Sequence, residues 1–156
     1  MDYRYHDSPL GRLLLVATPV GLSRVHMDDA RPMPLQAHWR PAIRQLDEAC
    51  RQLDDYFAGR RRAFELPLDL GGTPFQREVW TALQEIPFGH TTSYAELARR
   101  IQRPRAIRAV GTANGANPIA VIVPCHRVIG SNGSLTGYAG GLPRKELLLR
   151  LEGAWL

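Results

Sequence analysis

The sequence predicts an α+β fold in two domains, the first holding the strands and the second most of the helices. Short apolar runs and alternation within residues 1–28 are typical of strands, whereas helix-start signals recur after Gly71-Gly72. The charge changes at the same point: ten arginines balance ten acidic residues in residues 1–72, while the whole net charge of +5 falls in residues 73–156. We therefore expect one domain over residues 1–72 and a second over residues 73–156.

Two strands joined by a tight turn are expected early in the first domain. Residues 13–17 form an apolar run, and apolar and polar residues alternate over residues 22–26. The segment between them, Pro19-Val20-Gly21, is typical of a turn. Residues 28–41 contain three prolines without a clear period and are expected to form a loop. Residues 64–70 alternate again, which predicts one more strand before the boundary.

A helix is expected between these strands, opening at Pro41 and ending at Gly59. Its apolar residues recur at steps of three and four, which places them on one face of a helix. That stripe consists of Ile43, Leu46, Cys50, Leu53 and Phe57. Cys50 therefore lies in the expected buried seam, where a free cysteine acts as a small apolar side chain.

The second domain begins with a well-marked helix. Thr73 is a candidate N-cap, Pro74 suits the first helical position, and Gln76 completes a capping box. The expected buried face consists of Phe75, Val79, Leu83 and Ile86.

A helix-turn-helix is expected next. Ser93 and Glu96 have capping-box spacing and open a helix through Ile101, and Pro104 opens another that runs to about Asn114. Helical hairpins are common, so the pattern alone is weak evidence for DNA binding. The second helix is rich in small residues, which suit close approach either to a partner or to another helix.

Positive charge is concentrated on this pair of helices. Five arginines fall in a ten-residue window without an acid among them: Arg99, Arg100, Arg103, Arg105 and Arg108. A solvated helical face is one interpretation. A phosphate-binding surface is the other, and we favour it because arginine is always charged and binds phosphate in a bidentate manner.

A buried strand over residues 119–123 and a last helix complete the expected elements. The strand leads directly into Cys125. The helix should begin at Pro143 and stop at Gly153, with Leu147, Leu148 and Leu151 buried.

Cys125 is the candidate nucleophile. A thiol with an ordinary pKa near 8.5 is only slightly ionised at neutral pH, so it needs a base that a third group holds in place. His126 is the neighbouring candidate base, although adjacent side chains on an extended chain diverge, so contact requires a bend or a bridging water. Glu152 could orient the histidine, and Asn117 could hold the local loop.

Composition excludes several classes of protein. No apolar run approaches the roughly 18 residues of a membrane span. The polar start at residues 1–7 is unlike a secretory signal. Only two cysteines are present, which favours a reducing cytoplasmic location and argues against a cysteine-rich zinc site.

Several segments, taken in order, resemble the O6-alkylguanine-DNA alkyltransferases. The run Pro124-Cys125-His126-Arg127-Val128 is highly specific, and the match is dense after residue 73 but loose before it. The other matching segments are Ser8-Pro9-Leu10-Gly11, Gly72-Thr73-Pro74-Phe75-Gln76, Ser93-Tyr94, Arg108-Ala109-Val110-Gly111, Asn117-Pro118, Gly137-Tyr138-Ala139-Gly140-Gly141-Leu142 and Leu151-Glu152-Gly153.

The resemblance implies a fold and a reaction. The first domain would be a small ribonuclease-H-like α/β domain with a structural role, and the second a mostly helical DNA-binding domain. Cys125 would take an alkyl group from O6 of guanine, and O4 of thymine is a further candidate. His126, through a water, and Glu152 would form a proton relay, Asn117 would support the turn, and Tyr94 would hydrogen-bond the base.

The resemblance also implies contacts with double-stranded DNA carrying O6-alkylguanine. The protein would bind in the minor groove as a monomer and flip the base. We expect no cofactor, no metal ion and no association with a membrane. Arg108 would fill the gap left by the base. Further DNA contacts would come from Tyr94, Ala109, Gly111 and Ser131, and the base pocket from Tyr138, Ala139 and Val128. A thioether cannot be hydrolysed, so each molecule would act once.

Three alternatives belong to other classes. A non-catalytic lesion-binding protein would lack a reactive cysteine, which Cys125 argues against. A Cys-His hydrolase would not need the arginine window. A plain DNA-binding regulator would have no use for the Cys-His pair.

Overall fold

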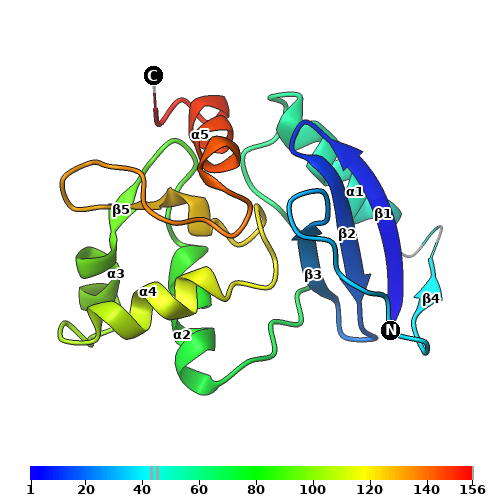
Figure 1. Cartoon of the computed structure of the whole chain (residues 1–156), viewed down its shortest axis with the longest axis horizontal. Coiled ribbons are helices and arrows are strands. Elements are labelled where there is room, and N and C mark those ends of the chain that lie inside the picture. The colour runs from blue at the N-terminus through cyan, green and yellow to red at the C-terminus, as the bar shows by residue number, and fades with distance from the viewer. Residues whose placement is uncertain (43, 45, 156) are drawn as a thin grey trace. The chain divides into compact units, whose positions relative to one another are not determined.

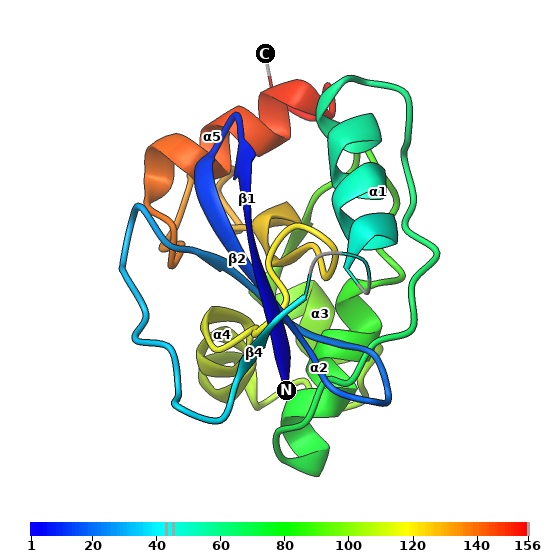
Figure 2. The same cartoon turned by 90° about the vertical axis from the view of Figure 1, so that its right-hand side faces the viewer.

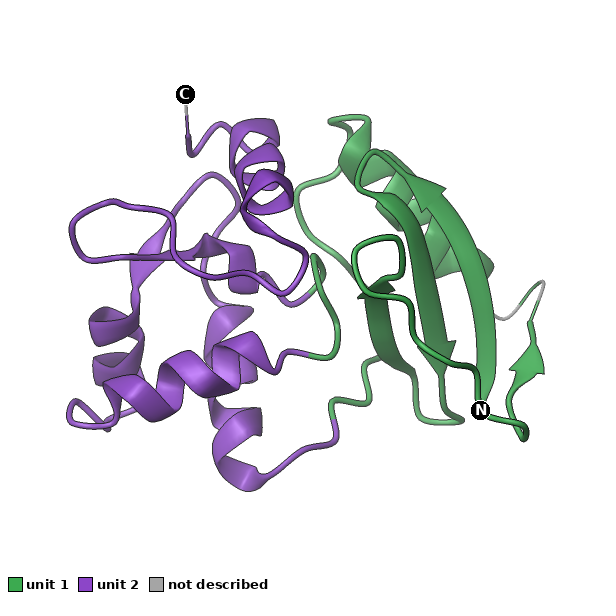
Figure 3. Cartoon of the chain, viewed as in Figure 1, with its two compact units in different colours: residues 1–70, 118–122 green, residues 71–117, 123–156 purple. Residues whose placement is uncertain are grey.

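The computed structural model describes residues 1–42, 44 and 46–155. These form two units, unit 1 with residues 1–70 and 118–122 and unit 2 with residues 71–117 and 123–156 (Figure 3). The expected α+β fold is confirmed, with the larger sheet in unit 1 and most helices in unit 2 (Figure 1).

Unit 1 is built on a four-stranded sheet in the order β3-β2-β1-β4. Its antiparallel strands are β1 (Asp2–Ser8), β2 (Gly11–Ala17) and β3 (Leu22–Met27), and β4 (Arg40–Pro41) pairs with β1 in parallel. Residues 13–17 of the central strand β2 are all buried, as the apolar run indicates. The hairpin predicted around Pro19-Val20-Gly21 is confirmed.

Helix α1 (Asp47–Phe57) lies along β1 (Figures 1 and 2), and Asp54 accepts a 2.7 Å hydrogen bond from His6. The predicted start at Pro41 is wrong. Backbone hydrogen bonds from Arg40 to Met1 and from Ala42 to Tyr3 hold that stretch extended against β1. Gly59, with φ of 78°, ends the helix as predicted.

The predicted apolar stripe of α1 is largely confirmed. Leu46, Cys50 and Leu53 are buried, whereas Phe57 is half-buried. Ile43 lies outside the described residues. Cys50 is a free, buried cysteine in this seam.

Two predicted strands are absent from the described residues. Residues 64–70 form only an isolated bridge, at Leu68, beside β3, where Pro67 has no N–H to donate. Residues 119–123 form another isolated bridge, at Ile119, and then turn at Val121, whose φ is 70°. Residues 64–70 alternate and residues 119–123 are apolar, but neither pattern by itself supplies the neighbouring strand with which a β-strand must pair.

Unit 2 contains a cluster of three helices, α2 (Pro74–Leu83), α3 (Tyr94–Arg100) and α4 (Ile107–Gly115). Thr73 and Gln76 form the predicted capping box of α2. The indole N–H of Trp80 donates a 2.8 Å hydrogen bond to the Ala113 carbonyl and so fixes α2 against α4. None of the described helices is long and apolar enough to cross a membrane.

The two expected helices of the helix-turn-helix are α3 and α4, but α4 begins at Ile107 rather than Pro104. The turn is a Schellman motif, in which the N–H groups of Gln102 and Arg103 donate to Arg99 and Ala98. Gln102 has a φ of 61° at the position that glycine usually occupies. This left-handed residue turns the chain sharply, so Pro104 lies in a turn before α4.

The remaining elements of unit 2 surround Cys125. They are the 3-10 turn η1 (Cys125–Arg127), the parallel pair β5 (Thr92–Ser93) and β6 (Val128–Ile129), and helix α5 (Leu142–Leu151). Gly153 follows α5 with φ of 75°, as predicted. The predicted buried face of α5 is partly wrong, because Leu147 is exposed and Leu151 half-buried, while Lys145, Leu148 and Leu149 are buried.

Candidate active site

Cys125 lies at the start of η1, not at the end of a strand as the sequence suggested. The Cys125 N–H donates to the Val123 carbonyl at 2.8 Å, and the Arg127 N–H donates to Pro124 at 3.0 Å, which closes the turn. Cys125 is 7% exposed and His126 is fully buried. Because successive residues of a 3-10 turn point about 120° apart, three adjacent side chains reach three different surroundings.

Glu152, at the C-terminal cap of α5, binds two residues of this turn. Its carboxylate accepts a 2.8 Å hydrogen bond from His126 Nε2 and two 2.8 Å hydrogen bonds from Arg127. Arg127 also donates to the Ile86 carbonyl at 2.6 Å. Burial raises the pKa of Glu152, but the hydrogen bonds from His126 and Arg127 outweigh it and lower the pKa to about 2.

The tautomer of His126 follows from this arrangement. An ionised carboxylate can only accept, so the hydrogen lies on Nε2 and the lone pair on Nδ1. Burial lowers the pKa of His126 despite the attraction of Glu152, which keeps the ring neutral at pH 7. His126 Nδ1 is buried without a hydrogen-bond partner among the described residues. It is therefore a base with an available lone pair.

The Cys125 thiol is held among groups that act in opposite directions. Burial raises the pKa of this thiol, while a hydrogen bond from Asn117 and the charge of Lys145 lower it. Asn117 also donates a 2.7 Å hydrogen bond to the Val123 carbonyl, two residues before the cysteine. Asn117 therefore contacts both the thiol and the backbone that leads into the turn.

Lys145 is a site residue that the sequence analysis missed. It is fully buried, and Nζ donates to the Val128 carbonyl at 2.6 Å and the Thr136 carbonyl at 3.1 Å. Burial lowers its pKa to about 8, against the opposing effect of Cys125. Two features could have indicated Lys145 as a site residue: it is the single lysine of the chain, and it lies three residues before the buried Leu148.

Tyr94 is the first residue of α3 and faces the loop over residues 130–141. Its hydroxyl and that of Thr136 are 2.7 Å apart. A side-chain carbon placed on Gly111 would lie 3.7 Å from the Tyr94 ring, so the tyrosine packs closely on α4. In the loop, Ser131 and Ala139 are exposed and Tyr138 is half-buried, while Val128 is fully buried just before it.

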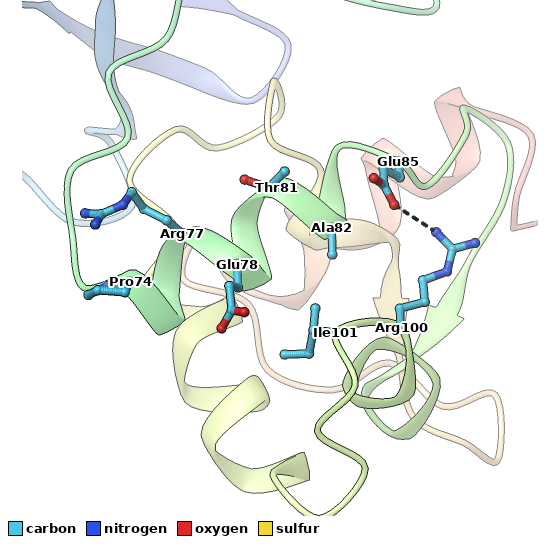
Figure 4. Close-up of a pocket in the computed structure, with 8 residues that line it drawn as sticks. All are labelled: Pro74, Arg77, Glu78, Thr81, Ala82, Glu85, Arg100 and Ile101. Carbon is cyan, nitrogen blue, oxygen red and sulfur yellow. Dashed lines mark ion pairs between the residues drawn. The ribbon is translucent and has the colours of Figure 1, made fainter.

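Three of the five arginines in the window are neutralised by acids on other elements or on their own helix. Arg99 pairs with Glu96 at 2.6 Å, Arg103 with Glu78 at 3.0 Å, and Arg100 with Glu85 at 3.9 Å. Figure 4 shows the last pair across a cleft of about 480 Å³ between α2 and α3.

Arg105 and Arg108 differ from these three arginines. Both are exposed and make no ion pair with another described residue. The free positive charge of the window therefore lies at the start of α4, beside Ala109 and one turn from Gly111.

Models of known protein families match both halves of the chain. The family model described as the DNA-binding domain of 6-O-methylguanine DNA methyltransferase matches residues 74–154, and that for its ribonuclease-like domain matches residues 1–70. The chain belongs to the 6-O-methylguanine DNA methyltransferase family. The resemblance drawn from the Cys125 motif is thereby confirmed.

Relatives of this methyltransferase family match nearly the whole chain. The methylated-DNA–protein-cysteine methyltransferase of Mycolicibacterium paratuberculosis is 51% identical over 97% of this chain and 92% of its own length. That of Methanosarcina acetivorans is 50% identical over 99% of both. The crystal structure of Mycobacterium tuberculosis OGT in complex with DNA has a TM-score of 0.92 at 49% identity, covering 99% of this chain and 94% of that one.

Proposed function

We propose that the protein repairs DNA by moving an alkyl group from O6 of guanine to Cys125, once per molecule. The observation that carries the proposal is a buried cysteine followed by a neutral histidine, whose Nδ1 lone pair is available and whose other nitrogen Glu152 holds at 2.8 Å. Residues 73–156 form the DNA-binding and alkyl-acceptor domain, and residues 1–72 form a supporting domain.

The reaction begins with removal of the thiol proton. His126 Nδ1 accepts it through a water, and Glu152 stabilises the resulting imidazolium. The Cys125 thiolate attacks the alkyl carbon, so the S–C bond forms as the C–O6 bond breaks and the electron pair moves onto the guanine. Tyr94 donates a hydrogen bond to the base as this charge develops.

The product explains why the protein acts once. A thioether is not hydrolysed by water, and the other cysteine, Cys50, lies in the buried seam of α1 in unit 1. No cofactor is needed, because the sulfur itself accepts the alkyl group. Asn117 supports the turn, and Lys145 lowers the pKa of the thiol against its burial.

Recognition requires the base to leave the stack. The target atom lies within a duplex, and extruding a nucleotide costs a few kcal/mol. Helix α4 enters the minor groove with Ala109 and Gly111 against the DNA, Arg108 fills the gap left by the base, and Ser131 makes a further contact. Val128, Tyr138 and Ala139 line the pocket that receives it.

Two findings support duplex DNA as the partner. Arg105 and Arg108 carry the unpaired charge at the start of α4, and a relative of 49% identity was solved in complex with DNA. The protein acts as a monomer on DNA carrying O6-alkylguanine, with O4-alkylthymine as a further candidate. Two free cysteines suit a cytoplasmic location.

A methyl-transfer experiment tests the proposed function. Incubation with a duplex bearing O6-methylguanine is expected to add one methyl group to the peptide that contains Cys125, as mass spectrometry of the digested protein would detect. Cys125→Ser should abolish the transfer and Cys50→Ala should retain it. Methyl on Cys50 would contradict Cys125 as the acceptor. Tight binding of the duplex without any adduct would instead favour a lesion-binding protein.

Arg108→Ala is expected to slow repair of duplex DNA by about tenfold or more, because no side chain then replaces the extruded base. Its reaction with free O6-benzylguanine should be nearly unchanged, since a free base needs no extrusion. Both rates are measured by adduct formation over time.

The matched control is Arg60→Ala, which removes an exposed arginine paired with Asp55 in unit 1. It changes the net charge equally and should leave both rates near those of the wild type. Equal losses of Arg108→Ala on duplex and free base would contradict the gap-filling role.

A further inference from the structure

Thr136 joins two groups of the candidate site that are far apart in the sequence. Its hydroxyl lies 2.7 Å from the Tyr94 hydroxyl, and its carbonyl accepts a 3.1 Å hydrogen bond from Lys145 Nζ. The same ammonium holds the Val128 carbonyl, directly after the turn that carries Cys125. The buried lysine thus fixes the backbone at Thr136, and that backbone places the hydroxyl on Tyr94.

We propose that Thr136 is a positioning residue for alkyl transfer, whose hydroxyl donates to the Tyr94 oxygen and so directs the Tyr94 hydrogen to the flipped base. The proposal rests on the proposed function and extends it to a residue that does not itself touch the reacting atoms. A tyrosine hydroxyl has one hydrogen and two acceptor sites. When Thr136 fills one acceptor site, the tyrosine hydrogen is free to point elsewhere.

The chain of hydrogen bonds also makes Tyr94 a stronger donor. Each hydrogen bond in a chain polarises the next, so donation from Thr136 strengthens the hydrogen bond that Tyr94 donates to the base. The benefit falls on the rate rather than on binding, because negative charge appears on the guanine only as the C–O6 bond breaks. A leaving base that carries an electron-withdrawing substituent stabilises this charge itself and needs less help.

The first test compares two replacements of Thr136. Thr136→Val keeps the shape but has no hydroxyl, and we expect the rate of reaction with O6-benzylguanine to fall about threefold to tenfold. Thr136→Ser keeps the hydroxyl and should react at nearly the wild-type rate. Using the free base excludes effects on DNA binding, and thermal denaturation shows the folded fraction of each variant.

Thr18→Val is the matched control. The Thr18 hydroxyl makes a side-chain hydrogen bond of the same 2.7 Å length, to Asp69, but in unit 1. It should cost stability without slowing transfer. A loss in Thr18→Val equal to that in Thr136→Val would overturn the proposal, because it would mark the effect as one of stability.

A double-mutant cycle with Tyr94→Phe separates positioning from structure. If Thr136 acts through Tyr94, adding Thr136→Val to Tyr94→Phe causes no further loss of rate. The loss from Thr136→Val alone should also shrink with an O6-benzylated base bearing an electron-withdrawing group. The proposal would be overturned if Thr136→Val slowed the Tyr94→Phe protein by the same factor as the wild type. It would also be overturned if Thr136→Val slowed the reaction equally with O6-benzylguanine and with the base bearing the electron-withdrawing group.

Failure here differs from failure of the proposed function. If wild-type protein does not alkylate Cys125, the repair reaction itself is wrong. If the wild type reacts and Thr136→Val reacts equally fast, only the role of Thr136 is wrong. Should Thr136→Val not fold, Thr136→Ala removes the same hydroxyl with a smaller side chain and is expected to show the same loss relative to Thr136→Ser.

Discussion

Glu152→Gln is expected to lower the free energy of unfolding by about 3–5 kcal/mol, the usual cost of leaving a buried charge without its partner. The carboxylate accepts one hydrogen bond from His126 and two from Arg127. A glutamine offers one oxygen and turns an N–H₂ toward the remaining donors. Urea denaturation at neutral pH measures the loss, and alkyl transfer should slow because His126 is no longer oriented.

The same helix offers a control for this prediction. Glu146 is partly exposed on α5 and binds Arg150 at 2.8 Å, so Glu146→Gln should cost about 1 kcal/mol or less. If Glu152→Gln cost no more than Glu146→Gln, the buried network would not contribute to stability.

Acid denaturation gives the Glu152 prediction a second readout. The pKa of Glu152 is about 2 in the folded protein and 4.5 as an ordinary carboxyl group. Between these values the unfolded chain binds more protons, so the stabilisation is complete above pH 4.5 and is lost as the pH falls towards 2. Glu152→Gln lacks this contribution and should show a shallower loss of stability across that range.

Lys145→Met is expected to slow alkyl transfer by about tenfold or more, with each unit of increase in the thiol pKa lowering the thiolate fraction tenfold. The substitution removes the charge that opposes burial at Cys125 and both hydrogen bonds to the carbonyls of Val128 and Thr136. The measurement is the rate of reaction with O6-benzylguanine as a function of pH.

The pH profile distinguishes the charge of Lys145 from its packing. Lys145 loses its proton as the pH rises through about 8, so the wild-type advantage over Lys145→Met should narrow above that pH. Arg150→Met, which removes an exposed cation from the same helix, should react like the wild type at all pH values. A Lys145→Met protein that reacted at the wild-type rate would contradict the effect of the charge.

Local signals in the sequence predicted local structure well. The capping box of Thr73 and Gln76 and the stop at Gly59 depend on residues within one turn of the helix end, so the sequence holds all the information needed. The start of α1 could not be found in this way. The stretch around Pro41 is held extended by β1, almost forty residues earlier in the chain.

Candidate site residues could be predicted where they lie together in one sequence motif. Contacts between residues far apart in the sequence could not be predicted. Cys125, His126 and Asn117 lie within one short segment. The acid that pairs with Arg103 comes from α2, and the acid that pairs with Arg100 comes from the turn that follows α2. The five arginines of the window therefore suggested more unpaired positive charge than the folded protein has there. Lys145 was overlooked because a lysine is ordinarily a surface residue, and only its hydrogen-bond partners reveal why it is buried.

The single lysine of the chain gives the folded protein an unusual chemical property. Reagents that acylate amines usually modify many surface side chains, but here the one lysine side chain is fully buried beneath the loop over residues 130–141. Burial is what lowers the pKa of this amine, so an opening that exposes Lys145 returns the pKa to its ordinary value and lets the reagent reach Nζ. Acylation of Lys145 therefore serves as an internal chemical reporter of how often α5 and the loop separate.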